Sequence, residues 1–201
     1  MKLKPFEKFL LSNRIRYFIQ RKFEAPRLFE NVILPGNAVC LEVGTGAGVG
    51  TLLINKYLDF KKLISIDIDP GMLKTAQNML KNPPGWAGNV DMTRIELVEK
   101  DLLEIADENN TFDAVFLFDV LHHIPEWKEG IGEIYKVLKP GGIFVFEEAL
   151  ISDSWYWFND FFGHVPFSGD ELMKTIEEKG FKIQRFHKPF LFPFCFVKAE
   201  K

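Results

Sequence analysis

Apolar positions recur along the chain with two different periods, and these periods predict its secondary structure. Short runs rich in Val, Ile and Phe are typical of buried strands. We assign five strands to Ala38–Val43, Leu63–Asp67, Arg94–Lys100, Phe112–Phe118 and Gly142–Glu147. Apolar residues at helical spacing lie between them around Thr51, Leu73 and Ile134, while residues 102–110 give no clear element. Strands that alternate with helices indicate successive βαβ units, so we predict a doubly wound, mostly parallel α/β sheet.

The pattern changes after residue 150. An aromatic insert covers residues 151–168, and a helix is expected over Asp170–Lys179, followed by two strands. The last strand, ending Phe196-Val197-Lys198, follows its predecessor through Lys188-Pro189. That connection is too short for a parallel crossover, so the strand should run antiparallel. The expected sheet therefore has seven strands, the last two forming an antiparallel hairpin.

The N-terminal stretch has a different character. Residues 4–22 place apolar residues at helical spacings with Lys and Arg between them, which predicts an amphipathic helix, and a second short helix is expected after Pro26. A chain of 201 residues with 47% hydrophobic residues suits a single domain. We divide it into an N-terminal helical lid (1–35), a ligand-binding core (36–150), the aromatic insert (151–168), and a C-terminal helix and hairpin (169–201).

Composition narrows the class of protein. We expect neither a secretory signal nor a membrane-spanning segment, because charged residues interrupt every candidate apolar run near the N-terminus and no other run is long enough. Cys40 and Cys195 lie among apolar neighbours and suit core positions, so we expect a reduced, cytoplasmic setting. We also expect no metal site, because no Cys and His cluster has ligand spacing. An acidic pI of about 5.9 argues against a nucleic-acid partner.

Basic residues are concentrated at the start of the chain. Residues 1–30 carry eight Lys or Arg against three Glu, although the formal net charge of the whole chain is -3. This excess suits an anionic acceptor or peripheral contact with an acidic membrane, but a solvated helix face has the same composition.

A glycine-rich turn follows the first predicted strand. Gly44, Gly46 and Gly48 allow positive φ and close approach of a ligand, and the start of the next helix offers unpaired N–H groups to a carboxylate. A dinucleotide fingerprint needs a sixth-position glycine, but the sixth residue from Gly44 is Val49 and from Gly46 is Thr51. The pattern therefore disfavours a nicotinamide cofactor.

Carboxylates follow the second and third strands. Asp67 lies about 20 residues beyond the glycine turn, where such folds bind a ribose diol. Asp69 precedes Pro70 and suits a helix cap, so we assign Asp67 to the ribose. Asp101 suits an adenine amino group, although by itself it is more typical of a solvated turn, so the assignment depends on its neighbours. Its candidate partners against the adenine ring are Ile68 and Leu102.

Together these segments resemble the class I S-adenosylmethionine-dependent methyltransferases, particularly the small-molecule branch with the ubiquinone and menaquinone enzymes. The resemblance runs from about Val39 to Phe181. Its motifs are Glu42-Val43-Gly44-Thr45-Gly46-Ala47-Gly48, Ile66-Asp67-Ile68-Asp69-Pro70-Gly71-Met72-Leu73, Phe112-Asp113-Ala114-Val115, Leu121-His122-His123-Ile124 and Val137-Leu138-Lys139-Pro140-Gly141-Gly142. It implies S-adenosylmethionine as cofactor and S-adenosylhomocysteine as product. The residues that it implies at the cofactor are Glu42, Gly44, Thr45, Gly46 and Gly48 at the methionine end, Asp67 at the ribose, Asp101 at the adenine and Asp119 beside the methyl group.

Candidate bases for the acceptor are few. His122 and His123 follow the fourth strand and His164 lies in the insert, and any of them has the pKa range of a general base. The paired histidines also occur in family members of differing chemistry, which favours a structural role for them. Glu147 and Glu148, at the end of the fifth strand, are alternative bases, one of which suits a cap.

The insert and the N-terminal helix suit the acceptor side. Six aromatic residues fall within residues 155–162, which favours an apolar or aromatic acceptor, although aromatic packing onto the core explains them too. We expect residues 4–22 to lie over the donor, with Tyr17 near its carboxylate. The expected function is methyl transfer to a small molecule, lipid- or quinone-like. The alternatives are a protein side-chain methyltransferase and a catalytically silent S-adenosylmethionine-binding module.

Overall fold

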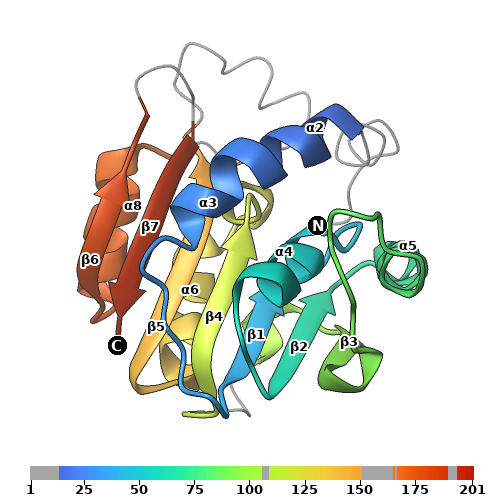
Figure 1. Ribbon diagram of the computed structural model, residues 1–201. Coiled ribbons are helices and arrows are strands. Elements are labelled where there is room, and N and C mark those ends of the chain that lie inside the picture. The colour runs from blue at the N-terminus through green and yellow to red at the C-terminus, as the bar shows by residue number, and fades with distance from the viewer. Residues whose placement is uncertain (1–13, 106–108, 151–164, 166, 190–193) are drawn as a thin grey trace.

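The computed structural model describes residues 14–105, 109–150, 165, 167–189 and 194–201, and its strands form one sheet (Figure 1). The strand order is β3-β2-β1-β4-β5-β7-β6. The strands are β1 (Val39–Val43), β2 (Lys62–Asp67), β3 (Ile95–Glu99), β4 (Phe112–Phe118), β5 (Leu138–Ala149), β6 (Lys182–His187) and β7 (Phe194–Glu200). The first five pair in parallel, and β7 runs antiparallel to both β5 and β6. The doubly wound sheet and its antiparallel last hairpin are confirmed.

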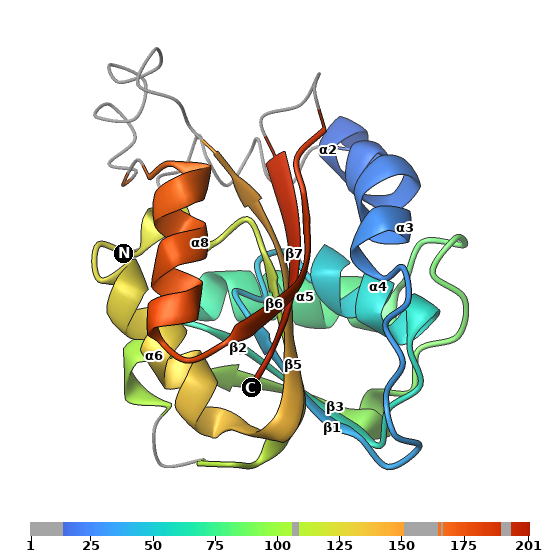
Figure 2. The same cartoon turned by 90° about the vertical axis from the view of Figure 1, so that its left-hand side faces the viewer.

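Helices cover both faces of the sheet. Figure 2 shows α6 (Trp127–Val137) and α8 (Gly169–Glu178) on one face, with α2 (Arg14–Ile19), α3 (Ala25–Leu28) and α4 (Val49–Tyr57) on the other. The long helix α5 (Pro70–Lys81) joins β2 to β3, and short 3₁₀ turns cover Met92–Arg94, Leu102–Glu104 and Leu121–His123. Two apolar clusters fill the layers on either side of the sheet, sharing the central strand β4, which is almost wholly buried.

The N-terminal helices differ from their expected arrangement. The short second helix expected after Pro26 is present as α3, which begins one residue earlier, at Ala25. It is not separated from the first helix, because α2, a π-helical turn (Gln20–Glu24) and α3 follow one another as one helical run. The wide π turn makes this feasible, since Ala25 donates its N–H to the carbonyl of Gln20, five residues back. Proline at the start of α3 lacks only an N–H that a first helical turn leaves unpaired.

Cys40 and Cys195 are both buried and unbonded to each other, as expected of core residues. Strand β5 begins at Leu138, earlier than the sequence suggested, and Gly141 in it has a φ of 77°. Within the described part of the chain, no helix is long and apolar enough to cross a membrane. Residues 4–13 of the amphipathic stretch and residues 151–164 of the aromatic insert lie outside it.

Candidate functional site

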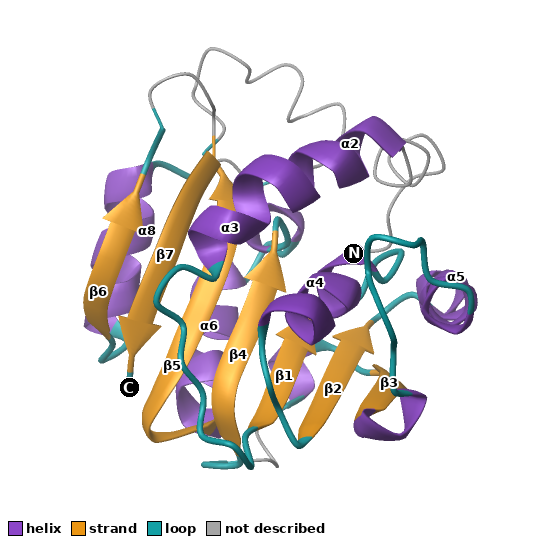
Figure 3. Cartoon of the chain, viewed as in Figure 1, coloured by secondary structure: helices purple, strands orange, loops and turns teal. Residues whose placement is uncertain are grey.

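A pocket opens at the carboxyl ends of β1, β2 and β4, and it encloses about 1190 Å³ of empty space including its mouth. Side chains from the turns after β1, β2, β3 and β4 line it, together with three from the N-terminal helical run. Figure 3 shows that run crossing above the carboxyl ends of the central strands. Ligands of doubly wound sheets bind at this edge, where the strand order reverses between β1 and β4.

The glycine turn after β1 forms the floor of the pocket. Gly44 has a φ of 80°, and a Cβ there would lie 2.4 Å from Cγ2 of Val120, so neither the backbone nor the space admits a side chain. Gly46 has a φ of 53°, but a Cβ there would meet nothing within 4 Å. Gly46 lines the pocket, so this open space is part of the pocket. The turn thus leaves room for a ligand against its backbone.

Asp67 lies at the pocket, whereas Asp69 caps a helix. Asp67 lines the pocket, and its Oδ2 accepts a hydrogen bond from the N–H of Gly46 at 2.8 Å while Oδ1 accepts one from the N–H of Asp69 at 2.9 Å. These two backbone donors fix the orientation of the carboxylate. Asp69 caps α5 by accepting from the N–H of Gly71 at 2.8 Å.

Glu42 is the most deeply buried carboxyl group of the pocket lining. Its Oε2 accepts hydrogen bonds from the hydroxyls of Thr51 at 2.5 Å and Ser65 at 2.6 Å, and Ser65 in turn lies 2.7 Å from the hydroxyl of Thr45. Burial raises the pKa of Glu42 to about 7, against the two hydroxyl bonds that lower it. Its Oε1 is buried without a hydrogen-bond partner among the described residues. Such an oxygen suits a donor supplied by a ligand.

The turn after β3 contributes the remaining expected cofactor residues. Asp101 lines the pocket and caps the 3₁₀ turn Leu102–Glu104, its Oδ1 accepting from the N–H of Leu103 at 2.9 Å. Leu102 is buried and Ile68 partly exposed, and both line the pocket with Asp101. The structure therefore brings together the carboxylate and the two apolar side chains that the sequence assigned to an adenine ring.

Arg16, Tyr17 and Gln20 form the side of the pocket that we call its roof. Arg16 is hydrogen-bonded to Glu24, and its Nη2 lies 3.2 Å from Oε1 of Glu147. The same oxygen lies 3.3 Å from Nε2 of Gln20. Glu147 is wholly buried, and desolvation raises its pKa well above the usual range even though Arg16 opposes the shift. The hydrogen bonds of Arg16 and Gln20 to Glu147 thus hold the roof against the end of β5.

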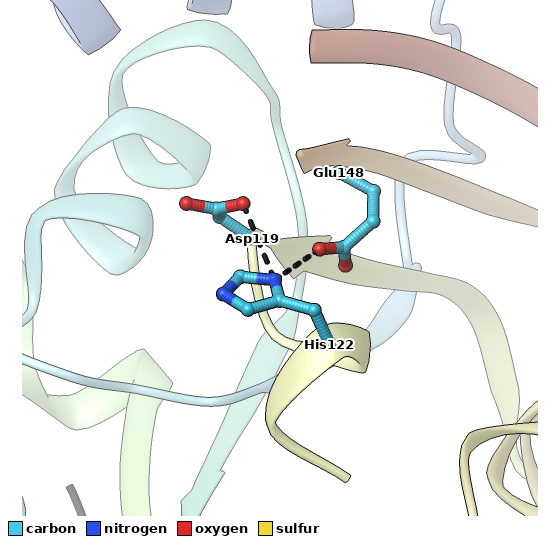
Figure 4. A group of neighbouring side chains, drawn as sticks. All are labelled: Asp119, His122 and Glu148. Atoms are coloured by element: carbon cyan, nitrogen blue, oxygen red, sulfur yellow. Dashed lines mark hydrogen bonds and ion pairs between the residues drawn. The ribbon is translucent and has the colours of Figure 1, made fainter. Parts of the chain in front are cut away.

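A second buried network lies beside the roof, at the ends of β4 and β5 (Figure 4). Nδ1 of His122 bonds to Oε1 of Glu148 and lies 3.6 Å from Oδ1 of Asp119. The other oxygen of Glu148 accepts from the N–H groups of Leu121 at 2.8 Å and Val120 at 3.2 Å, in the turn after β4. The cap expected of Glu147 or Glu148 on the segment after β5 concerns residues that lie outside the described part of the chain. Although these three side chains have the chemistry of metal ligands, their hydrogen bonds already explain their arrangement.

Asp119 is held in an uncommon backbone conformation. Its φ is 60°, which costs a non-glycine residue about 1 to 3 kcal/mol. Two hydrogen bonds stabilise it: its N–H donates to the carbonyl of Glu147 at 2.9 Å, and its Oδ1 accepts from the N–H of Ala149 at 3.0 Å. Asp119 also lines the pocket. The fold therefore fixes a carboxylate at the junction of the pocket and the buried network.

The three candidate histidines lie in different places. His123 lines the pocket, whereas His122 is 4% exposed and is not among the lining residues. Their ring centroids are 4.0 Å apart. His164 lies outside the described residues. Of the three, only His123 is seen beside the pocket, which makes it the best-placed candidate base.

A model of the methyltransferase domain family matches residues 41–146, the segment that runs from within β1 to within β5. The chain belongs to this family. Its relatives include a sterol 24-C-methyltransferase of Kluyveromyces lactis, 29% identical over 59% of this chain and 30% of that protein. Another is a demethylmenaquinone methyltransferase of Staphylococcus carnosus, 28% identical over 66% of this chain and 52% of that protein. The chain spans about half or less of the length of these two curated relatives.

Solved structures of methyltransferases share the fold. An S-adenosylmethionine-dependent methyltransferase from Mesorhizobium loti has a TM-score of 0.70 at 16% identity, covering 88% of this chain and 96% of that one. A second, from Aquifex aeolicus, has a TM-score of 0.71 at 19% identity and covers 99% of both chains. These structures therefore support the fold described above.

The glycine turn at the floor of the pocket and the carboxylates that line it were predicted from the sequence. Arg16 and Gln20 were not predicted, because their only sequence signal is that they flank Tyr17 on the amphipathic stretch.

Proposed function

We propose that this protein transfers a methyl group from S-adenosylmethionine to a small apolar or aromatic acceptor, releasing S-adenosylhomocysteine. The observation that carries this proposal is the set of fixed carboxylates around the glycine floor of one pocket. All of these residues line the pocket, and we assign Asp67 to the ribose diol, Asp101 with Ile68 and Leu102 to the adenine, and Glu42 to the ammonium group of the methionine end. Residues that fit all three parts of one ligand support that ligand more strongly than any single motif.

The donor supplies an activated methyl group bound to a sulfonium, so little covalent chemistry is left to the chain. The acceptor atom forms its bond to the methyl carbon as the carbon–sulfur bond breaks, and the electron pair remains on sulfur. The residues of the pocket must hold the reactants in line and exclude water. Arg16, Tyr17 and Gln20 close the pocket from above, and we assign the N-terminal helical run the role of a lid on this ground.

An acceptor hydroxyl or acidic carbon also has to lose a proton. We assign this step to His123, because it lines the pocket, and we assign His122 a positioning role, since it is buried and bonded to Glu148. The proton passes from the acceptor to the imidazole of His123. Relatives named for sterols and menaquinone support a small, apolar acceptor class.

Calorimetry followed by product identification tests the proposal. The protein should bind S-adenosylmethionine and S-adenosylhomocysteine and bind NADH far more weakly. Incubation with methyl-labelled donor and a lipid extract should then label a small acceptor. Asp59→Ala, an exposed carboxylate outside the pocket, serves as the matched control for Asp67→Ala. Tight binding of NADH, or label appearing only in protein, would overturn the proposal.

A further inference from the structure

The outer side of the N-terminal helical run carries exposed aromatic rings. Phe18 is 50% and Phe23 47% exposed, and their ring centroids lie 6.3 Å apart in an edge-to-face arrangement. Burying either ring would be favourable, because large apolar side chains gain about 1.5 to 3 kcal/mol on leaving water. Two neighbouring exposed phenylalanines on one helix mark a surface suited to a partner.

Cations are interleaved with these rings. The guanidinium of Arg21 lies 5.8 Å from the ring centroid of Phe18 and 5.3 Å from that of Trp86, in the loop after α5. The Nζ of Lys56 lies 5.6 Å from the Trp86 ring centroid and donates to the Trp86 carbonyl at 2.5 Å. Exposed Lys22 and Arg27 belong to the same helical run. We call this set the aromatic–basic face: Phe18, Arg21, Lys22, Phe23, Arg27, Lys56 and Trp86.

Two acidic residues, Glu24 in the helical run and Glu30 just after it, do not neutralise the aromatic–basic face. Glu24 is turned inward, where it is buried and paired with Arg16. Glu30 lies beyond the end of α3 and is paired with Arg185 of β6. The face therefore presents four cations and three aromatic rings, although the formal net charge of the chain is -3.

The aromatic–basic face lies directly outside the pocket. Arg16, Tyr17 and Gln20 line the pocket from the same helical run whose outer side bears Phe18 and Phe23. A partner that binds this outer side would therefore lie next to the roof and the pocket. The position of the face thus links a docking surface to the entry of the acceptor.

We propose that the aromatic–basic face docks the protein on an anionic lipid bilayer, from which the pocket takes its acceptor. Lys and Arg near an anionic membrane contribute about 1 kcal/mol each, while phenylalanine rings enter the boundary between headgroups and acyl chains. Tryptophan and arginine suit the headgroup level. The chain as a whole is acidic, with a formal net charge of -3, and the aromatic–basic face exposes the rings of Phe18 and Phe23 beside its cations. Cations mixed with exposed apolar rings favour a bilayer over a nucleic acid. This proposal rests on the proposed function for its lipid-like acceptor.

Vesicle sedimentation tests the docking. The protein should bind vesicles of phosphatidylcholine with about a third phosphatidylserine, bind pure phosphatidylcholine weakly, and lose binding as salt increases. Lys22→Ser with Arg27→Ser should weaken binding about 30-fold, and Phe18→Ser with Phe23→Ser at least about tenfold. Matched controls are Lys174→Ser, an exposed cation on α8, and Ile33→Ser, which is 87% exposed outside the face; both should bind as the parent protein does.

Calorimetry in solution separates the two proposals. None of the four substituted residues lines the pocket, so both double variants should keep the donor affinity of the parent. If the parent protein does not bind the donor, the proposed function is contradicted. The vesicle experiment still tests the docking, because it does not depend on donor binding. Equal binding to both vesicle types, or unchanged vesicle binding by both double variants, would overturn the docking. Release of the parent protein from vesicles by a single-stranded RNA oligonucleotide that binds it would also overturn the docking.

Discussion

The two walls of the pocket hold their carboxylates by contacts of very different range. On the donor wall, formed by Glu42, Asp67 and Asp101, the partners lie between 2 and 23 residues away along the chain. At the roof, Arg16 reaches Glu147 across 131 residues and Gln20 reaches it across 127. The donor wall is thus completed by β1 to β3, the start of α4 and the turns between them, whereas the roof forms only when the N-terminal run docks on β5.

Because of this difference, ligand binding depends on the donor wall and closure of the pocket depends on the roof. The donor wall is fixed by hydrogen bonds from backbone N–H groups and hydroxyls, which leave its outline independent of the roof. The roof relies on buried charges, whose desolvation costs nearly as much as their attraction returns, so loss of one partner is severe. We therefore expect substitutions on the donor wall to change ligand affinity and substitutions under the roof to change stability.

The largest effect should come from Asp67. Asp67→Ala removes a charged acceptor from two ribose hydroxyls, each bond contributing about 1.5 to 3 kcal/mol, so donor affinity should fall about 100-fold or more. Calorimetry measures this change. The neutral variant Asp67→Asn retains the shape of the side chain and should lose less. An unchanged dissociation constant for Asp67→Ala would contradict the ribose assignment.

The second largest effect should come from removing Arg16, the cation of the roof. Arg16→Met leaves Glu147 and Glu24 buried without their guanidinium, which should lower the free energy of unfolding by roughly 3 kcal/mol. Urea denaturation measures this loss. Adding Glu147→Leu should restore much of it, because the buried carboxyl is then absent. A single variant as stable as the parent would show that the roof does not depend on these charges.

The close contact between the glycine turn, which supports the donor wall, and the turn after β4 can be tested at Gly44. Gly44→Ala places a Cβ against Val120, which follows β4, and forces alanine to a φ of 80°, so the protein should lose about 2 kcal/mol of stability. Val120→Ala in the same chain removes the clash but not the backbone strain. The double variant should therefore recover only part of the loss in thermal unfolding. Full recovery would mean that the backbone conformation carries no cost.

The smallest expected effect is a pH dependence of donor binding. Burial raises the pKa of Glu42 to about 7, so below pH 7 the carboxyl must lose its proton before it can pair with an ammonium group. Donor affinity should consequently rise with pH and be about tenfold weaker at pH 6 than at pH 8. Glu42→Gln should remove this slope in calorimetry. A slope that survives the substitution would belong to another group.

Local features of the donor wall were predictable because neighbouring residues determine them. Asp69 before Pro70 caps α5, and alternating glycines after a strand form a turn at positive φ, whatever the rest of the chain does. The helical run through Pro26 was not predictable in the same way. Its π turn places the proline at the start of a helix, and nothing in the local sequence signals that turn.

The sequence by itself determined the order of strands and helices, the glycine floor and the carboxylates at the strand ends, since periodicity and turn chemistry act over a few residues. Only the tertiary structure decided that Arg16 and Gln20 meet Glu147, that His123 lines the pocket while His122 bonds to Glu148, and that Asp119 adopts a positive φ. Those outcomes depend on which distant segments exclude water from one another. Desolvation, which raises the pKa values of Glu42 and Glu147, exists only once the chain is packed.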